Sequence, residues 1–285
     1  MIGISIDIGL VNMFGRTQDL LALSSRRLAT GDRINGAWED PAGLIASENL
    51  EAQLAALEAE SRALERNDAV ARTAEAALAE VGGMLVEGEG LAVAAANTGA
   101  MSDAERAAIQ LEMDSINQSA ERTLRTASFG GTPLFNGEVA IPAGAGGGSF
   151  DLGMLSVSTL GATDIGGEVY SQRDTSSGEA LALNGDRPGD AQAVIGASRR
   201  EIATLRGAIG AFQRNEIGAR RAAVDTEFVN VSQANSLIRD TDYASEMVNF
   251  ARTQTLADST RMMLTFANQR PENVFIALGL ESRRL

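Results

Sequence analysis

Apolar residues recur every seven positions in the first part of the chain. The repeating residues are Leu50, Leu57, Leu64, Ala71, Leu78 and Leu85, with Ala74 and Val81 between them and a flanking row of Ala56, Ala63, Val70, Ala77 and Met84. A seven-residue apolar repeat sustained over five heptads is typical of helices that pack as coiled coils. The pattern predicts one long helix over residues 41–97. A buried helix of a compact bundle is the alternative interpretation.

A helix of this length is too long for a compact domain. It would extend roughly 80 Å at about 1.5 Å per residue, whereas a globule of this chain length has a radius of gyration of only about 19 Å. The length therefore favours a rod. Gly82, Gly83, Gly88 and Gly90 oppose the helix locally, because a glycine inside a helix costs about 1 kcal/mol relative to alanine. We expect a bend or a weakened stretch there.

Helical periodicity returns near the C-terminus. One row consists of Ile195, Ile202, Ile209, Ile217, Val224, Val231 and Ile238, and Leu205, Phe212 and Ala219 accompany it. The step from Ile209 to Ile217 is eight residues, which we attribute to the drift of a 3.6-residue helix against a strict heptad. A last helix is expected over residues 243–269, and Pro271 should end or kink it.

Two different patterns lie between these regions. Ser102 followed by Glu105 has the pattern of a capping box and predicts a helix over residues 102–126. From residue 129 to about residue 185, glycines punctuate short β-like pieces at Phe150–Leu152 and Leu155–Val157. The glycines at 144–148 lack the spacing and the following lysine of a phosphate-binding loop. A flexible surface hairpin is the favoured interpretation.

These elements together define a fold class. Short connections make sequential helices antiparallel neighbours, so the two helical arms should fold back beside each other. We predict a mainly α fold: a long antiparallel coiled-coil-like helical rod built from both chain ends, with a small β-hairpin and irregular middle segment. The low aromatic content, 4%, agrees with this prediction, because the core must then be built from Ala, Leu, Ile and Val.

Composition removes most catalytic chemistry. The chain has no Cys and no His, and every basic residue is Arg, which excludes thiolate and histidine chemistry, zinc sites and lysine Schiff bases. The net charge of −14 disfavours binding to nucleic acid. No apolar stretch predicts a membrane span, and the first residues lack the pattern of a standard secretory signal. We expect no enzymatic activity, no cofactor and no metal.

Five motifs carry a resemblance to a known family. They are the segments Leu28–Leu44, Thr73–Leu78, Phe129–Gly137, Ile238–Met247 and Leu264–Gln269. The first resembles the signature of bacterial flagellins, in which LSSG-x-RIN leads into A-x-DDPAGL. The others resemble the family patterns T-x-EGAL, F-N-G-x-x-L-x-N/D-G, I-x-D-x-D-x-A-x-E and L-x-x-A-N-Q. The motifs lie on both arms in the family's order. They are short, and they are spread across roughly 80% of the chain.

The resemblance implies a domain organisation. Residues 1–40 and 240–285 would form a terminal helical domain in the filament core, and residues 41–137 and 186–239 a rod-like helical domain. Residues 138–185 would be a short variable segment on the outside. The terminal arms would line a central channel and order only on assembly. Departures from the family pattern, including Glu39 and the charged last residues 279–285, leave a hook–filament junction protein as the alternative.

Polymerisation requires apolar surface that one molecule cannot cover by itself, because a heterologous contact that repeats without closing builds a helical filament. The expected assembly interface consists of Leu20, Leu21, Leu28, Arg33, Ile34, Asn35, Asp40, Pro41, Ala42, Gly43, Met247, Phe250, Leu256, Met263 and Phe266. The alternative is that these residues complete an intramolecular bundle. The segment Asn35–Gly43 is either a hinge that sets subunit contacts or an ordinary helix–turn–helix connection.

The resemblance also implies partners and a location. They are a homopolymer, an export chaperone at the C-terminal helix, the flagellar export apparatus, and hook-associated and cap proteins, with secretion to the extracellular flagellum. Family members that animal innate receptors recognise carry a basic stretch before an L-A-V sequence, whereas this chain has Glu87 and Glu89 before Leu91–Val93. Reversed charge should weaken that recognition. Asp240, Asp242 and Glu246 suggest acids at a helix start rather than a metal site.

Overall fold

The computed structural model describes residues 2–97 and 101–277, with side chains from residue 9 to residue 266 outside the gap. The long helices are α1 (Ile2–Thr30), α2 (Pro41–Ala96), α3 (Asp103–Thr126), α4 (Pro188–Phe212), α5 (Gly218–Arg239) and α6 (Tyr243–Ala277). The short elements are β1 (Ser128–Phe129), β2 (Thr132–Pro133), β3 (Ala140–Pro142), β4 (Ser149–Asp151), β5 (Thr163–Ile165), β6 (Glu168–Tyr170), the 3₁₀ turn η2 (Gln172–Thr175) and the π turn η3 (Gln213–Ile217). The mainly α fold, with long helices from both chain ends, is confirmed.

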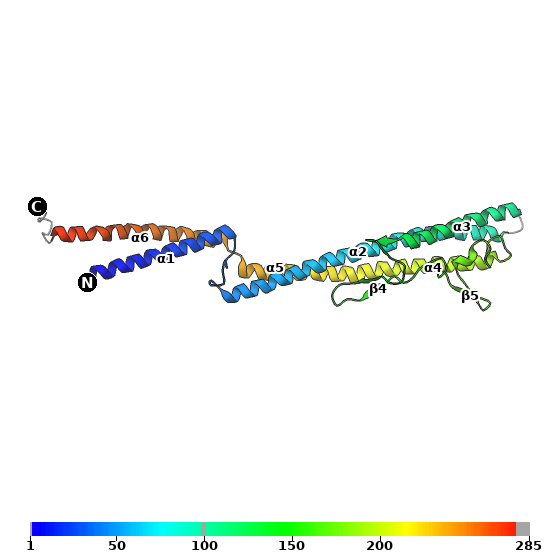
Figure 1. Ribbon diagram of the computed structural model, residues 1–285, viewed down its shortest axis with the longest axis horizontal. Helices are drawn as coiled ribbons and strands as arrows, with labels where there is room; N and C mark the ends of the chain where they lie inside the picture. The colour runs from blue at the N-terminus through cyan, green and yellow to red at the C-terminus, as the bar shows by residue number, and fades with distance from the viewer. Residues whose placement is uncertain (1, 98–100, 278–285) are drawn as a thin grey trace. The chain divides into compact units, whose positions relative to one another are not determined.

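The chain divides into two compact units. The terminal unit contains Met1–Ala55 and Phe228–Leu285, and the inner unit contains Ala56–Glu227. In the terminal unit α1 and α6 lie side by side and antiparallel (Figure 1). Their register follows from two contacts, since Ser24 bonds to Glu246 and Asp32 pairs with Asp240.

The inner unit is an antiparallel pair in which α2 packs against α4 and α5 (Figure 1). Three ion pairs set its register, Glu60–Arg220, Glu75–Arg206 and Glu89–Arg199. The predicted heptad stripe forms the core: Leu64, Ala71, Ala74, Leu78, Val81, Leu85, Ile195, Ile202 and Ile209 are all buried. Apolar side chains removed from water contribute about 25 cal/mol per Å², so burial of this stripe stabilises the pairing of α2 with α4 and α5.

Helix α3 folds back on α2, and its first turn is the one that the sequence predicts. Ser102 accepts a hydrogen bond from the Glu105 backbone N–H, while the Glu105 carboxylate accepts one from the Ser102 N–H. This capping box satisfies two backbone donors that a helix start leaves without partners. On the inner face of the helix Met113, Ala120 and Leu124 are buried. The predicted helix at residues 102–126 is therefore confirmed.

The eight-residue step from Ile209 to Ile217 has a different cause from the one expected. Residues Gln213–Ile217 form a π turn, closed by a hydrogen bond from the Gly218 N–H to the Gln213 carbonyl. A π turn accommodates one extra residue within a helix, so Ile209 and Ile217 are both buried and Val224 continues the row. The attribution to gradual drift is wrong, because the register is corrected at one place.

The four glycines of α2 do not interrupt its helical hydrogen bonding, which continues from Pro41 to Ala96. They fall into two kinds. A Cβ at Gly88 would lie 3.2 Å from the Met113 sulfur, and one at Gly82 would lie 3.5 Å from Ile202. A Cβ at Gly83 or Gly90 would meet open space. The close approach of α3 explains Gly88, and tertiary packing offsets the cost of the others.

The glycine-rich middle contains three antiparallel hairpins within residues 128–170: β1–β2, β3–β4 and β5–β6. The hairpin expected around the glycines at 144–148 is present, and its register pairs Ile141 with Phe150. The expected strand at Leu155–Val157 is wrong. Leu155 only donates one backbone hydrogen bond to the Phe135 carbonyl, and Val157 begins a turn. An apolar run by itself does not provide the second strand that a ladder needs.

Helix α6 continues through Pro271 to Ala277, so the proline does not end it. A proline loses one backbone hydrogen bond inside a helix, and here the helix continues beyond that loss. The expected charged tail at residues 279–285 lies outside the described residues. Among the helices of the described ranges, none is both long and apolar enough to cross a membrane.

Candidate assembly surface

The most buried positions of the contact between α1 and α6 are occupied by small and polar side chains, and half-buried apolar side chains flank them. Thr17 and Ser24 on α1 and Ala257 and Thr260 on α6 are buried. Their spacing is seven residues on α1, while Glu246, Thr253 and Thr260 are spaced by seven on α6. The seam is therefore a heptad repeat with polar residues at its centre. A search limited to apolar repeats finds Phe14, Leu21 and Leu28 at this seam but misses its buried polar row, although the spacing of that row is visible in the sequence.

Large apolar side chains of the same two helices face outward instead. They are Val11, Met13 and Leu20 on α1 and Met247, Val248, Leu256, Met262, Met263 and Phe266 on α6. Phe266 is 68% exposed and Leu20 is 53% exposed. Among the side chains described in the terminal unit, Ile34 and Ala257 are the only buried apolar ones. These exposed apolar side chains make the outward faces of α1 and α6 a candidate interaction surface.

The residues expected at the interface separate into two groups on the helices. Leu20, Met247, Leu256, Met263 and Phe266 are exposed. Leu21, Leu28 and Phe250 are half-buried and lie in phase with the buried positions Ser24 and Ala257. Their heptad phase places these three at the seam between α1 and α6, so the intramolecular alternative describes their surroundings.

The residues expected between α1 and α2 connect elements of the same chain. Arg33 donates hydrogen bonds to the carbonyl oxygens of Leu237 and Ile238 at the end of α5, where a helix leaves its carbonyls without partners. Ile34 is buried. The Asn35 amide donates to the Asp32 carbonyl at 2.7 Å. These bonds hold the joining segment against the end of α5.

The start of α2 is formed by the motif Asp40–Gly43. Asp40 accepts a hydrogen bond from the Gly43 N–H at 2.9 Å, which is the role of an N-cap carboxylate. Pro41 and Ala42 are exposed in the first turn, where the missing N–H of proline costs nothing. A Cβ at Gly43 would lie 2.7 Å from the Ile34 side chain, so any larger residue there would have to displace that side chain.

A buried charge cluster, which the sequence analysis did not identify, fixes the same region. Glu246 is buried and accepts a hydrogen bond from the Ser24 hydroxyl. Arg27 lies between two carboxylates, 3.9 Å from Glu246 and 3.5 Å from Glu39. The Glu39 side chain is only 4% exposed. Buried charges persist only when paired, so the cluster ties α1, the joining segment and α6 into one arrangement.

The other acids at the start of α6 act as caps. The Asp242 carboxylate accepts hydrogen bonds from the N–H groups of Ala244 and Ser245 at 3.0 and 3.2 Å. Asp240 accepts one from the Ser236 hydroxyl. Their oxygens therefore bind donors of the same chain. No group of three metal-binding side chains is found within the part of the chain that the structure describes.

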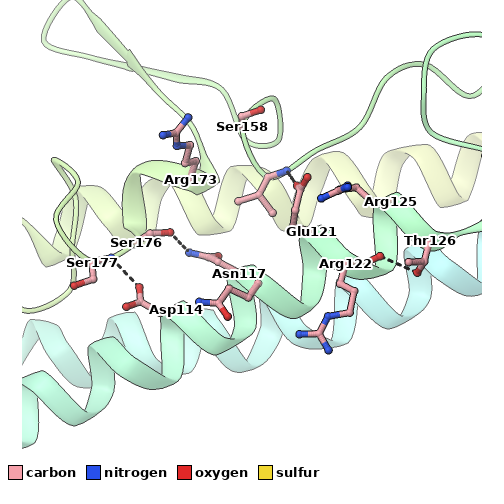
Figure 2. A pocket seen from close by; sticks show the side chains of 12 residues that line it. Asp114, Asn117, Glu121, Arg122, Arg125, Thr126, Ser158, Arg173, Ser176 and Ser177 are labelled. Atoms are coloured by element: carbon pink, nitrogen blue, oxygen red, sulfur yellow. Dashed lines mark hydrogen bonds between the residues drawn. The ribbon is translucent and has the colours of Figure 1, made fainter.

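The inner unit has a groove between α3 and the segment 157–177, and Figure 2 shows its lining. Polar side chains of α3 hold that segment in place. Asp114 accepts from the Ser177 N–H at 2.7 Å, Asn117 donates to the Ser176 hydroxyl at 3.0 Å, and Glu121 accepts from the Val157 N–H at 2.9 Å. The carboxylates of Asp114 and Glu121 therefore anchor the backbone of the segment 157–177.

A second anchor joins the β3–β4 hairpin to the helices of the inner unit. Glu60 forms two hydrogen bonds with the Arg220 guanidinium, at 2.7 and 2.8 Å, and accepts one from the Ala145 N–H. The hydrogen bonds from Arg220 are the main reason why the pKa of Glu60 lies below its ordinary value of 4.5. The exposed tip of the hairpin is thus attached on one side to α2 and α5.

Comparisons with known proteins agree with this architecture. A family model described as the bacterial flagellin N-terminal helical region matches residues 9–140, and one described as the bacterial flagellin C-terminal helical region matches residues 193–278. A flagellin of Halalkalibacterium halodurans is 30% identical over 249 residues, which cover 87% of this chain and 88% of that protein. The chain belongs to the bacterial flagellin family.

Other flagellins match over most of their length. The flagellar filament 30.7 kDa core protein of Treponema maltophilum is 28% identical over 94% of this chain and 95% of that protein. The flagellin of Bacillus subtilis is 29% identical over 87% of this chain and 89% of that protein. Flagellins are structural proteins, and residues 141–192 of this flagellin lie between the two family matches.

The two acids expected to alter receptor recognition lie on α2 of this flagellin. Glu87 is exposed. Glu89 is half-buried and pairs with Arg199 of α4 at 2.7 Å. Glu87 therefore presents a negative charge to solvent, while the charge of Glu89 is partly neutralised within the inner unit.

Proposed function

We propose that this flagellin is a structural subunit of the bacterial flagellar filament and polymerises through the exposed apolar side chains of its terminal unit. The observation that carries this proposal is the placement of Leu20, Met247 and Phe266 on the outside of a helix pair whose most buried positions are small or polar. Relatives named flagellar filament core proteins match over nearly their whole length. The chain acts as a building block and not as an enzyme.

The driving force is the covering of apolar surface by neighbouring copies. Burying one large apolar side chain contributes about 1.5–3 kcal/mol, so several such residues on α1 and α6 together exceed the cost of association. The outward apolar side chains of α1 and α6 cannot cover one another, because the two helices already pack together through their other faces. A contact of this kind repeats from copy to copy and builds an open helical polymer.

The regions of the chain then have separate roles in the filament. Residues 1–40 and 240–285 form the filament core, residues 41–137 and 186–239 form the surrounding rod-like domain, and residues 138–185 form the outer surface. The segment Asn35–Gly43 joins the core to the rod-like domain. Its hydrogen bonds to α5 and its cap on α2 support a role in holding α1 against the start of α2 and the end of α5.

The same proposal includes partners and location. The chain passes through the flagellar export apparatus, with a chaperone covering the apolar surface of α6 before assembly, and ends in the extracellular flagellum next to hook-associated and cap proteins. Exposed Met262, Met263 and Phe266 give such a chaperone an apolar helix face to bind. A hook–filament junction protein is the second candidate from the sequence, and no observation favours it.

Electron microscopy of the purified chain tests the function. Full-length protein should form long filaments without other proteins, and added salt should favour them because it screens the repulsion between chains of net charge −14. Deletion of residues 1–30 or 250–285 should abolish filaments while the inner unit keeps its helical circular dichroism. Filaments from either truncated chain would contradict the mechanism. A full-length chain that joins existing filaments but does not form long filaments by itself would favour the junction protein.

We also propose that this flagellin is a weak ligand of the animal innate receptor. The exposed Glu87 lies before Leu91–Val93 on α2, where recognised family members carry basic residues. Like charge at a binding surface costs affinity. A receptor reporter assay should give low potency for the purified chain, and Glu87→Arg should raise it. Full potency of the unchanged protein would refute the proposal.

A further inference from the structure

The segment that joins α1 to α2 carries an unusual exposed residue. Trp38 is the chain's single tryptophan, and 70% of its surface is exposed. Tryptophan has one of the largest apolar surfaces of any side chain, and it is enriched at the centres of protein interfaces. An exposed tryptophan in a chain with so few aromatic residues therefore requires an explanation.

The surroundings of Trp38 hold its ring in place. The Arg26 guanidinium lies over the ring at 5.9 Å from its centroid. The backbone turns at this point, with the Glu39 N–H donating to the Gly36 carbonyl at 3.0 Å. A Cβ at position 36 would lie 2.7 Å from the Trp38 Nε1 atom, so the glycine makes room for the ring. The next residue, Glu39, is fixed by Arg26 and Arg27.

A ring held in this way loses little conformational freedom on binding. Ordering a mobile side chain at an interface costs about 0.5–1.5 kcal/mol, and a pre-organised aromatic residue avoids most of that cost. The arrangement resembles an interface anchor before its partner arrives. A structural role within the chain does not explain it, because such a role would bury the ring.

We propose that Trp38 is an anchor residue that becomes buried against a second copy of this chain during filament assembly. This inference rests on the proposed function and identifies one of its contact residues. The joining segment that carries Trp38 contacts elements with exposed apolar side chains: Arg33 donates to the Leu237 carbonyl, and Gly31 lies beside Tyr243 at the start of α6. The exposed residues Leu237, Tyr243 and Met247 lead from there onto the outward face of α6.

Charge also favours a second copy as the partner. The Arg26 side chain is 50% exposed and presents a cation beside the ring. A chain of net charge −14 offers carboxylates in excess on its surface. A neighbouring copy can therefore pair with Arg26 while it covers Trp38, and both interactions become stronger as water is excluded.

Fluorescence of the single tryptophan gives a direct test with the full-length protein. On polymerisation the emission of Trp38 should shift to shorter wavelength, and quenching by acrylamide should fall several-fold, because the ring leaves water. Electron microscopy of the same sample reports whether filaments form. Filaments with unchanged emission and quenching would overturn the anchor role while the proposed function stands. Failure of the wild-type chain to form filaments would overturn both.

Alanine substitutions at two equally exposed positions separate the anchor role of Trp38 from a general effect of removing a surface side chain. Trp38→Ala should raise the critical concentration for polymerisation roughly tenfold or more, as truncation of an interface hot spot does. Val169→Ala, on the β5–β6 hairpin and also 70% exposed, should leave it unchanged. Trp38→Phe should recover part of the loss. The thermal unfolding of each monomer reports folding, and an unchanged critical concentration for folded Trp38→Ala would contradict the proposal.

Discussion

The two units of this flagellin both contain antiparallel helices, but they differ in how many of their large apolar side chains are buried. Each contains antiparallel helices with a seven-residue repeat at the seam. In the inner unit the repeat consists of Leu64, Leu78 and Leu85, which are fully buried. In the terminal helix pair the buried positions include Thr17, Ser24, Ala257 and Thr260, and Phe266 is on the outside.

The difference shows how one chain combines a stable scaffold with an adhesive surface. A buried leucine contributes about 1.5–3 kcal/mol, whereas one intramolecular hydrogen bond contributes only about 0.5–1.5 kcal/mol net. The leucine seam of the inner unit therefore stabilises the isolated chain. The seam of the terminal unit, which is polar at its most buried positions, fixes the register of α1 and α6 and leaves several large apolar side chains exposed, which the proposed function assigns to contacts with other copies.

The largest expected contrast comes from the same substitution in the two units. Leu78→Ala should lower the free energy of unfolding by about 2–5 kcal/mol, because it leaves a cavity in the inner core. Leu20→Ala, at an exposed position, should change it by less than about 0.5 kcal/mol but should raise the critical concentration for polymerisation. Urea unfolding followed by circular dichroism measures the first quantity and light scattering the second. Equal losses of stability would remove the distinction between the units.

A second substitution probes the polar seam. Glu246→Ala removes the partner of Ser24 and leaves Arg27 facing only Glu39, so the pairing of α1 with α6 should weaken by about 1–3 kcal/mol. Hydrogen exchange along α1 should accelerate, while the inner helices should keep their protection. Asp258→Ala, at an exposed position of α6, is the matched control. Unchanged exchange in α1 would show that the charge cluster does not hold the seam.

The Glu60–Arg220 pair should make the inner unit sensitive to acid. Because the pKa of Glu60 is lowered in the folded chain, the pair's stabilisation is fully present above pH 4.5 and is lost as the pH falls through the lower folded-state pKa. Glu60→Gln should lower the free energy of unfolding by about 1 kcal/mol at neutral pH. In acid, the difference in unfolding temperature between this variant and the wild type should disappear. Glu65→Gln, which breaks the exposed pair with Arg221, should have little effect at any pH. A gap for Glu60→Gln that does not depend on pH would contradict this assignment.

The smallest expected effects concern the glycines of α2. Gly83→Ala and Gly90→Ala should each stabilise the inner unit by about 0.5–1 kcal/mol, since a Cβ at either position meets open space. Gly88→Ala should gain less or lose stability, because its Cβ would press on the Met113 sulfur at 3.2 Å. Thermal unfolding of the three variants measures the order. If Gly88→Ala stabilised the unit as much as the other two substitutions, α3 would be shown to shift easily and make room for the Cβ.

Several parts of the fold were predictable because they depend on local sequence or on one repeated spacing. The capping box at Ser102 is contained within four residues, and the stripe from Leu57 to Leu85 follows from helical geometry. The candidate surface was predictable only as a hypothesis. Leu20, Leu256 and Phe266 were expected at an interface and are exposed on the helix pair, and the part that any of the expected residues plays in assembly stays a prediction.

The sequence by itself therefore determined the helices, the mainly α class and the family, since each depends on periodicity or on a contiguous motif. Tertiary structure alone decided the π turn at Gln213–Ile217, the continuation of α6 past Pro271, and the burial of Glu39 and Glu246. It also decided which face of the terminal helices lies inside. The physical reason is that a row of residues spaced by seven marks one face of a helix but does not determine whether that face lies inside or outside. Contact with the partner helix decides, and here Thr260 of α6 lies opposite the N-terminal half of α1.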